Sequence, residues 1–290
     1  MSMFQIPPAL DWLKGSPEGQ AWLRDLPVRV KACIDKWKLS LETPYQRSFV
    51  SIVFPARSAD GAPRVLKIQY PHPESDHEEE ALRLWNGEGA VRLFDYDPEQ
   101  HALLLERCEP GDHLSRAGVD EALRFFIETL PRLWVRAGKP FKSVMDEASG
   151  WLAELPLVWE RAGRPFETAL LEAALEALNR LRSTQGEQVL VHQDLHGDNV
   201  LRATREPWLV IDPKPLIGER EFSLAPIIRD YDFGHSRADV ISRLDRLISA
   251  LNLNRERARL WALGQTLAWA SDGNKTSKEH VETARWLWQA

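Results

Sequence analysis

The sequence predicts an α+β protein with two lobes, a sheet-rich N-terminal lobe followed by a mainly helical one. Strand-type segments cluster before residue 107, after one helical stretch. After Gly111, apolar residues recur at three- and four-residue spacing, which is typical of amphipathic helices. A short β-type island interrupts this helical part between residues 189 and 212. We therefore expect an N-terminal lobe over residues 1–107 and a C-terminal lobe over residues 108–290.

The N-terminal lobe is predicted to contain a helical extension, five strands and a second helix. The extension covers residues 1–37, and its helical spacing runs from Pro17 to Trp37, with the proline in the first turn where it is favoured. An Asp60-Gly61 turn predicts a hairpin. The expected strands cover residues 38–41, 49–54, 64–68, 90–96 and 102–107, and the second helix covers residues 74–85.

The C-terminal lobe is predicted to be helical on both sides of its β-type island. The three amphipathic stretches that precede the island, and the long one that follows it, have helical spacing. The island itself reads as VLVH, then VL, a turn at ATREP, and WLVID. The expected helices cover residues 119–137, 142–162 and 165–183 and recur within 222–290.

Composition excludes several classes of protein. The net charge is -6 and the pI is about 5.8, so the chain lacks the basic footprint of a nucleic-acid-binding protein. Two cysteines, Cys33 and Cys108, are too few for a disulfide framework or a thiolate zinc site. The segment MSMFQIPPALDWLKG lacks the charged and apolar regions of a signal peptide, so we do not expect it to be one, and no apolar run approaches about 20 residues. We expect a cytoplasmic protein with no membrane partner, whose mild acidic excess suits a cationic small molecule.

The segment VHQDLHGDN has two chemical interpretations. His192, Asp194, His196 and Asp198 alternate as metal ligands do along a strand, which would suit a metallohydrolase. However, Gly197 and its polar neighbours are typical of a loop, and the remaining histidines form no second ligand cluster. His192, Asp194 and Asn199 also match H-x-D-x-x-x-x-N, the pattern of kinase catalytic loops. A kinase also needs a carboxylate for Mg²⁺ and a lysine for the phosphates, and other segments of the chain can supply both.

Phosphoryl transfer needs a positioned hydroxyl and Mg²⁺ that bridges the phosphates. Asp194 can accept a hydrogen bond from an attacking hydroxyl, and Asn199 offers a neutral oxygen to Mg²⁺. This ion also prefers a carboxylate. Asp212 supplies one at the end of the apolar strand WLVI, and a tight hairpin through ATREP would bring it beside Asn199.

A lysine within an apolar strand indicates a buried partner. Lys67 lies inside VLKI, where an unpaired ammonium would be costly. The following helix offers three consecutive glutamates, and Glu78 lies one turn before the apolar Leu82. We expect Glu78 to pair with Lys67 and to hold its ammonium against the α- and β-phosphates of a nucleotide.

The sequence resembles the aminoglycoside phosphotransferase family in five features that occur in the same order: Lys67, Glu78, ALLLERCEPG, HQDLHGDN and IDPKPLIGE. Within that family, the sequence is most similar to the aminoglycoside/hydroxyurea branch, which includes streptomycin 6-kinases. Three segments carry this similarity: WNGEGAVRLFDYD, IDPKPLIGE and LNLNRERARLWALGQTLAWAS. The resemblance implies a protein-kinase-like fold, ATP, Mg²⁺ and transfer of the γ-phosphoryl group to a hydroxyl of a small molecule. An aminoglycoside-type antibiotic or hydroxyurea is the implied acceptor.

The resemblance also implies a role for each matching residue. The N-terminal lobe would bind the nucleotide, and the C-terminal lobe would carry the catalytic loop, residues 190–213, and the acceptor site. Asp194 would be the catalytic base or hydroxyl-orienting group, and His192 would brace its loop. The other assignments are Asn199 and Asp212 as Mg²⁺ ligands, Lys67 and Glu78 as the phosphate-holding pair, the backbone of Leu105, Glu106, Arg107 and Cys108 as the adenine contact, and Asp230, Asp232 and Asp272 as candidate acceptor residues. His196 and Asp198 receive no role.

Three positions depart from the family pattern. The expected nucleotide loop, LETPYQRSFVS, has no glycine, although glycine eases the approach of backbone amides to phosphate. Pro215 replaces a glycine, and Ser223 stands where an aspartate usually braces the catalytic loop. Two alternatives therefore stay open beside an antibiotic kinase: a small-metabolite kinase of the same fold, and a nucleotide-binding pseudo-kinase without turnover.

Overall fold

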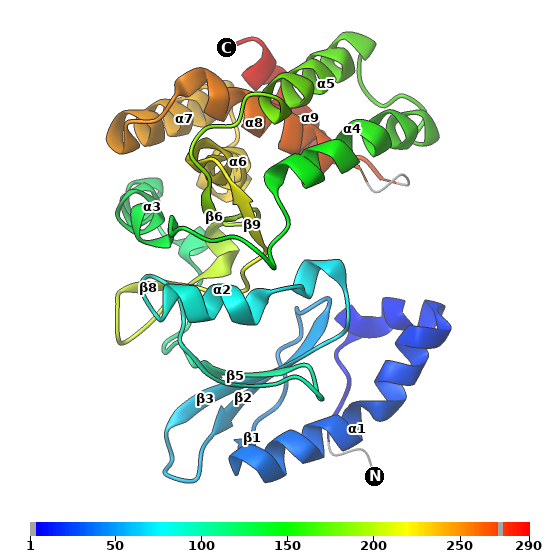
Figure 1. Ribbon diagram of the computed structural model, residues 1–290, viewed down its shortest axis with the longest axis vertical. Coiled ribbons are helices and arrows are strands. Elements are labelled where there is room, and N and C mark those ends of the chain that lie inside the picture. Colours follow the sequence, from blue (N-terminus) through cyan, green and yellow to red (C-terminus); the bar gives the residue numbers. More distant parts are fainter. Residues whose placement is uncertain (1–3, 272–274) are drawn as a thin grey trace. The chain divides into compact units, whose positions relative to one another are not determined.

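The computed structural model describes residues 4–271 and 275–290 and has an α+β architecture (Figure 1). It divides into two compact units. The first comprises the described residues up to Gly111 together with Ala203–Leu209, and the second comprises Asp112–Arg202 and the described residues from Val210 onward. No helix in the described ranges is long and apolar enough to cross a membrane.

The first unit is built on a five-stranded antiparallel sheet with the order β1-β2-β3-β5-β4. Its helix α1 occupies the range that the sequence predicts, and the Ser16 side chain caps it by accepting a hydrogen bond from Gly19 N at 3.1 Å. The elements are η1 (Pro8–Gly15), α1 (Pro17–Trp37), β1 (Ser40–Leu41), β2 (Ser51–Arg57), β3 (Pro63–Gln69), η2 (Pro73–Ser75), α2 (Glu78–Trp85), β4 (Leu93–Asp97) and β5 (Ala102–Glu106).

Strand β3 presents its two faces to different helices. Leu66 and Ile68 are fully buried in the core that α1 forms with the sheet, through residues such as Leu26. Because side chains alternate along a strand, Lys67 points to the opposite face, where α2 lies (Figure 1). Helix α2 begins at Glu78 rather than at residue 74, because a separate 3-10 turn precedes it. Glu78 is therefore the first residue of the helix that faces Lys67.

The second unit is mainly helical, as the spacing predicts, but its short strands include one that the sequence did not indicate. This strand, β9 (Pro215–Gly218), pairs antiparallel with β6, and Pro215 lies opposite His192. Proline and glycine are typical of turns, which hid the strand. The elements after Gly111 are η3 (Leu114–Arg116), α3 (Val119–Leu133), α4 (Val144–Arg161), α5 (Thr168–Arg182), β6 (Val189–His192), η4 (Gly197–Asn199), β7 (Val200–Arg202), β8 (Trp208–Val210), β9, η5 (Arg220–Leu224), α6 (Ala225–Arg229), η6 (Tyr231–Phe233), α7 (Arg237–Leu251), α8 (Arg255–Ala268) and α9 (Lys278–Trp288). Trp208 and Leu209 of β8 are counted with the first unit.

A buried glutamate connects the β6–β9 pair to helix α8. Glu219, which follows β9, is 2% exposed. Its carboxylate accepts hydrogen bonds from Arg257 Nε at 2.9 Å, from Arg257 Nη2 at 2.8 Å and from Trp261 Nε1. A buried carboxylate is stable only when its oxygens are satisfied in this way. These hydrogen bonds of Glu219 hold the end of β9, and with it the segment from Asp212 to Gly218, against α8.

Candidate functional site

The loop after β6 places its first polar residues by hydrogen bonds to the main chain. His192 is 2% exposed, and its Nδ1 accepts from Asp194 N at 3.1 Å and from Lys214 N at 3.5 Å. Burial lowers the pKa of His192 to about 4, against the smaller opposing effect of nearby carboxylates. His192 is therefore neutral at pH 7 and braces the two segments that flank the site.

Asp194 is an ionised carboxylate with a cation on each oxygen. Lys214 Nζ lies 3.0 Å from Oδ2, and Arg229 Nη2 lies 3.5 Å from Oδ1. His196 Nε2 lies 3.9 Å from Oδ1. Burial by itself would raise the pKa of Asp194, but Lys214, His196 and Arg229 outweigh it and hold the pKa below its ordinary value. The side chain can thus accept a hydrogen bond at neutral pH.

The structure brings Asn199 and Asp212 to neighbouring positions. Ile211 N donates to Asn199 O at 2.9 Å, so the residue before Asp212 is bonded to Asn199. Asn199 Nδ2 donates to Asp194 O at 2.8 Å, which leaves its side-chain oxygen as the atom able to act as a ligand. Asp212 has a φ of 53°, a left-handed conformation that is uncommon outside glycine. Such strain is often found at functional sites, where surrounding contacts impose it.

Asp230 braces the loop that carries Asp194, whereas Ser223 makes its hydrogen bonds elsewhere. Ser223 Oγ donates to Arg220 O at 2.6 Å and accepts from Trp134 Nε1 at 3.1 Å. Neither partner belongs to the loop that carries Asp194. Asp230 Oδ2 instead accepts from Gly197 N, inside the loop, at 2.8 Å.

Asp230 therefore has a structural role in this loop. It is 7% exposed, and its second oxygen accepts from Asp232 N at 3.1 Å. Both oxygens are engaged by main-chain amides, so the carboxylate holds the loop, and a contact of Asp230 with the acceptor stays a prediction. The missed signal was the spacing of Asp230 and Asp232, which suits an N-terminal helix cap over η6.

The alternating residues of the loop do not converge on one point. His196 Nδ1 accepts from Asp198 N at 3.3 Å, while the Asp198 carboxylate accepts from Ser115 Oγ. His192 is turned into the interior, as described above. Among the described residues, no group of three or more His, Cys, Asp or Glu side chains could hold a metal ion. The geometry therefore gives no support to the interpretation as four metal ligands.

Asp232 lies on the exposed side of this loop. Burial and the carboxylates of Asp230 and Asp198 raise its pKa. Mutual repulsion of this kind is relieved when a cation binds between the carboxylates. Asp272, the third candidate acceptor residue, lies outside the described residues.

In the first unit, Lys67 and Glu78 form the predicted pair. Lys67 Nζ lies 2.6 Å from Glu78 Oε2, and both side chains are buried. Gln69 Nε2, two residues along the same face of β3, donates to the same oxygen at 2.7 Å. Gln69 was not predicted as part of this pair, although the period of two along the strand places it on the same face as Lys67.

The segment from Leu105 to Cys108 leaves the sheet at the end of β5. The side chain of Glu106 accepts from Arg205 and from Arg92 N, and Arg107 pairs with Glu42 at 2.6 Å, so these side chains serve local structure. Cys108 is buried, which raises the pKa of its thiol to about 12. In the described ranges, the main chain of Cys108 makes no hydrogen bond with the protein, so its polar groups are available to a ligand.

The glycine-free loop before β2 is held by other residues of the first unit. Tyr45 N donates to Val53 O at 2.9 Å, and the Ser48 and Ser51 hydroxyls are 2.6 Å apart. Trp12 Nε1, from the N-terminal extension, donates to Phe49 O at 2.8 Å. Trp12 also makes an edge contact with Tyr70. The extension thus anchors the loop at Phe49, a connection that no local sequence pattern signals.

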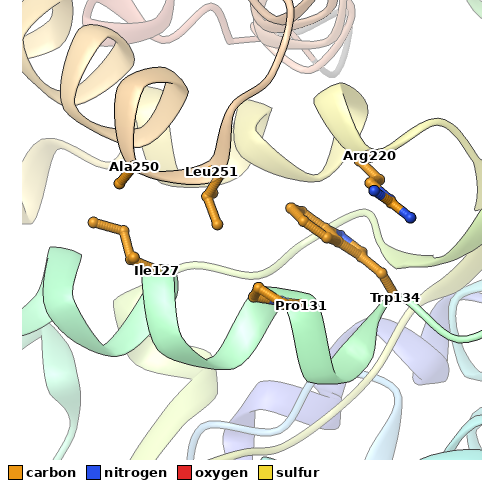
Figure 2. A pocket seen from close by; sticks show the side chains of 6 residues that line it. All are labelled: Ile127, Pro131, Trp134, Arg220, Ala250 and Leu251. Carbon is orange, nitrogen blue, oxygen red and sulfur yellow. The ribbon is translucent and has the colours of Figure 1, made fainter.

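A cavity of about 310 Å³ lies elsewhere in the second unit, between α3 and the end of α7 (Figure 2). None of the predicted site residues lines it. Its one charged side chain, Arg220, is paired with Glu187 at 2.9 Å and lies over the Trp134 ring at 5.6 Å. The chemistry of the catalytic loop does not extend to this cavity, which is lined by Ile127, Pro131, Trp134, Arg220, Ala250 and Leu251.

Comparison with known proteins adds an independent result. A family model described as aminoglycoside/hydroxyurea antibiotic resistance kinase matches residues 36–274. A hydroxyurea phosphotransferase of Kitasatospora aureofaciens is 36% identical over 277 residues, which is 93% of this chain and 80% of the relative. A streptomycin 6-kinase of Streptomyces glaucescens is 37% identical over 257 residues, 86% of this chain and 83% of the relative.

Solved structures support the same fold. The choline kinase LicA from Streptococcus pneumoniae superposes with a TM-score of 0.62 at 12% identity, covering 90% of this chain and 99% of that one. A thermostable mutant of the aminoglycoside phosphotransferase APH(4)-Ia, with AMP-PNP and hygromycin B, superposes with a TM-score of 0.57 at 16% identity, covering 89% of this chain and 95% of that one. The fold is protein-kinase-like, and the chain is a small-molecule phosphotransferase. It belongs to the aminoglycoside/hydroxyurea antibiotic resistance kinase family.

Proposed function

We propose that this protein transfers the γ-phosphoryl group of ATP to a hydroxyl of an aminoglycoside-type antibiotic or of hydroxyurea. The observation that carries the proposal is the partly buried, ionised carboxylate of Asp194, which lies between two cations and is bonded through its main chain to Asn199. A carboxylate held in this state can orient a hydroxyl for in-line attack. Because the reaction consumes ATP, we place it in the cytoplasm.

Asp194 acts on the acceptor hydroxyl. The hydroxyl donates a hydrogen bond to the carboxylate, and its oxygen attacks the γ-phosphorus while the bond to the bridging oxygen breaks. The hydroxyl proton passes to Asp194 and from there to solvent, and ADP leaves with the electron pair. Since its cationic neighbours lower the pKa of Asp194, its main contribution is to orient the hydroxyl before the proton moves.

The donor atoms beside Asp194 fit Mg²⁺. The Asn199 side chain offers an oxygen, because its nitrogen is engaged by Asp194 O, and Asp212 offers a carboxylate. One or two protein oxygens, completed by water and phosphate oxygens, are the usual ligand set of this ion. When bound, Mg²⁺ would neutralise charge on the phosphates. Asn199 and Asp212 would hold it, and His192 would keep their loops in register.

In the first unit, we assign the phosphates to Lys67 and the adenine to the segment from Leu105 to Cys108. Lys67 Nζ and Gln69 Nε2 both donate to Glu78 Oε2, and this shared oxygen fixes the Lys67 ammonium beside the start of α2. The unengaged main chain of Cys108 suits the donor and acceptor pattern of adenine. Trp12 and the serine pair would hold the nucleotide loop in place of glycines.

The acceptor is assigned from charge and from the relatives. The raised pKa of Asp232 beside Asp198 supports a cationic group, such as the amino or guanidino groups of an aminoglycoside. The relatives are named for streptomycin and hydroxyurea. A metabolite such as choline would satisfy the same carboxylates, and a pseudo-kinase is the alternative that the glycine-free loop motivates.

ATP consumption by the purified protein tests the proposal. Streptomycin, other aminoglycosides, hydroxyurea, choline, homoserine and sugars would each be offered with ATP and Mg²⁺, and products would be identified by mass. We expect a mass gain of one phosphoryl group on an antibiotic, and its loss in Asp194→Asn with ATP binding retained. Phosphorylation of metabolites alone would assign the metabolite kinase. ATP binding without turnover on any acceptor would assign the pseudo-kinase.

A further inference from the structure

Asp194 has a cation near each of its two carboxylate oxygens, and the two cations are held differently. Arg229 is fixed on the interior side of the carboxylate: Nη1 donates to Gln265 Oε1 at 2.7 Å, and its guanidinium lies 4.5 Å from the Trp269 ring centroid. Gln265 is in turn held by Gln193 O at 2.9 Å. This buried arrangement already supplies one permanent counter-charge to Asp194.

Lys214 is a second cation on the other oxygen and is held differently. Its Nζ lies 3.0 Å from Asp194 Oδ2 and 5.7 Å from the Trp269 ring centroid. The Lys214 side chain is 17% exposed, against 7% for Arg229. Lys214 is thus the more exposed of the two cations, so the Oδ2 side of Asp194 is more accessible to a hydroxyl than the Oδ1 side.

The position of Lys214 in the chain is set by the structure around it. Gln193 N donates to Lys214 O at 3.0 Å, and Lys214 N approaches His192 Nδ1 at 3.5 Å. The main chain of Lys214 is thus held to the strand end that carries Asp194. A flexible side chain on a fixed main chain can keep its ammonium near one carboxylate oxygen and still move by small amounts.

We propose that Lys214 is a catalytic residue that contacts the transferring phosphoryl group on the acceptor side, an inference that rests on the proposed function. A hydroxyl that donates to Asp194 Oδ2 lies beside Nζ, because both bind the same oxygen. The phosphoryl group arrives at that hydroxyl and brings negative charge with it. Lys214 has three N–H donors, so it can keep its contact with Asp194 and donate to a non-bridging oxygen. A preorganised cation at this point stabilises the transition state more than either substrate.

Steady-state kinetics of Lys214 variants tests the inference with the acceptor that the wild-type protein phosphorylates. Removal of one preorganised donor typically lowers kcat about 10²–10³-fold. We expect Lys214→Met to lower kcat by about this factor while KM for ATP and for the acceptor changes less than about threefold, since the contact forms only in the transition state. Lys214→Arg keeps the charge with a different geometry and should recover about tenfold or more of the lost kcat.

Two controls separate this role from a structural one. Lys278→Gln removes a lysine of the same unit whose side chain is 81% exposed, and it should leave kcat unchanged. Propylammonium added to Lys214→Ala should restore part of kcat without altering its urea midpoint, because the cation acts on the reaction and not on the fold.

The outcomes distinguish the inference from the proposed function. The inference alone is overturned if the wild-type protein phosphorylates its acceptor and the kcat of Lys214→Met stays within threefold of the wild-type value. A loss that appears in KM and not in kcat would overturn it as well. A wild-type protein that transfers no phosphoryl group would overturn both.

Discussion

Asp230 offers the sharpest test of how the structure holds its catalytic loop. The carboxylate accepts from Gly197 N at 2.8 Å and from Asp232 N at 3.1 Å, and it is 7% exposed. A hydrogen bond to a charged acceptor contributes about 1.5–3 kcal/mol. Asp230→Ala removes two such bonds and should lower the free energy of unfolding by about 3–5 kcal/mol. Asp230→Asn keeps one acceptor oxygen and should lower it by about 1.5–3 kcal/mol.

The activity should fall with the stability, because Gly197 belongs to the loop that carries Asp194 and Asn199. A displacement of about 1 Å can lower a rate about 10²-fold, so we expect kcat of Asp230→Asn to fall about tenfold or more at a temperature where the variant is folded. Urea unfolding followed by tryptophan fluorescence gives the stability, and an ATP-coupled assay gives kcat.

Ser223→Ala is the matched control for this prediction. It removes the hydrogen bond from Trp134 and the one to Arg220 O, at a cost of about 1–2 kcal/mol, and should leave kcat unchanged. The reasoning is refuted if Ser223→Ala loses kcat while Asp230→Asn keeps the stability and kcat of the wild type.

Three further predictions concern other parts of the molecule. Glu78→Gln removes the carboxylate that lies 2.6 Å from Lys67 Nζ, which should destabilise the fold by about 3–5 kcal/mol and raise KM for ATP about tenfold; a wild-type KM would contradict the assignment. The pKa of His192 is about 4 in the folded chain and 6.5 as its ordinary value, so the unfolded chain binds the proton first as pH falls. Stability should therefore decline by about 3 kcal/mol between pH 6.5 and 4, and urea midpoints of His192→Asn over that range should show a shallower decline. Trp12→Phe removes the hydrogen bond to Phe49 O and should raise KM for ATP about two- to fivefold without changing kcat; an unaltered KM would show that the extension does not position the loop.

Local features of the fold were accessible from the sequence. The helix from Pro17 to Trp37 has a proline start and a continuous apolar period, and both its ends match the prediction. The pairing of Lys67 with Glu78 followed from one strand, one helix and the cost of burying an ammonium. The hairpin that brings Asn199 beside Asp212 followed from their spacing.

Features that depend on distant segments were not accessible. Strand β9 begins with a proline and ends with a glycine, so it reads as a turn until β6 supplies a partner. The sequence showed that Ser223 stands where the family usually has a bracing aspartate, but it did not show that Asp230 holds the loop through Gly197 N.

The sequence by itself determined the family and the order of most helices and strands, and it named the residues that we propose for phosphate and magnesium, since these depend on periodicity and on short spacings. Only the tertiary structure decided what surrounds Asp194. Lys214, Arg229 and Gln265 come from β9's leading segment, α6 and α8, and no short-range pattern relates them. The pKa of a carboxylate depends on its distance from nearby charges, and only the folded chain sets the distances between Asp194 and these side chains.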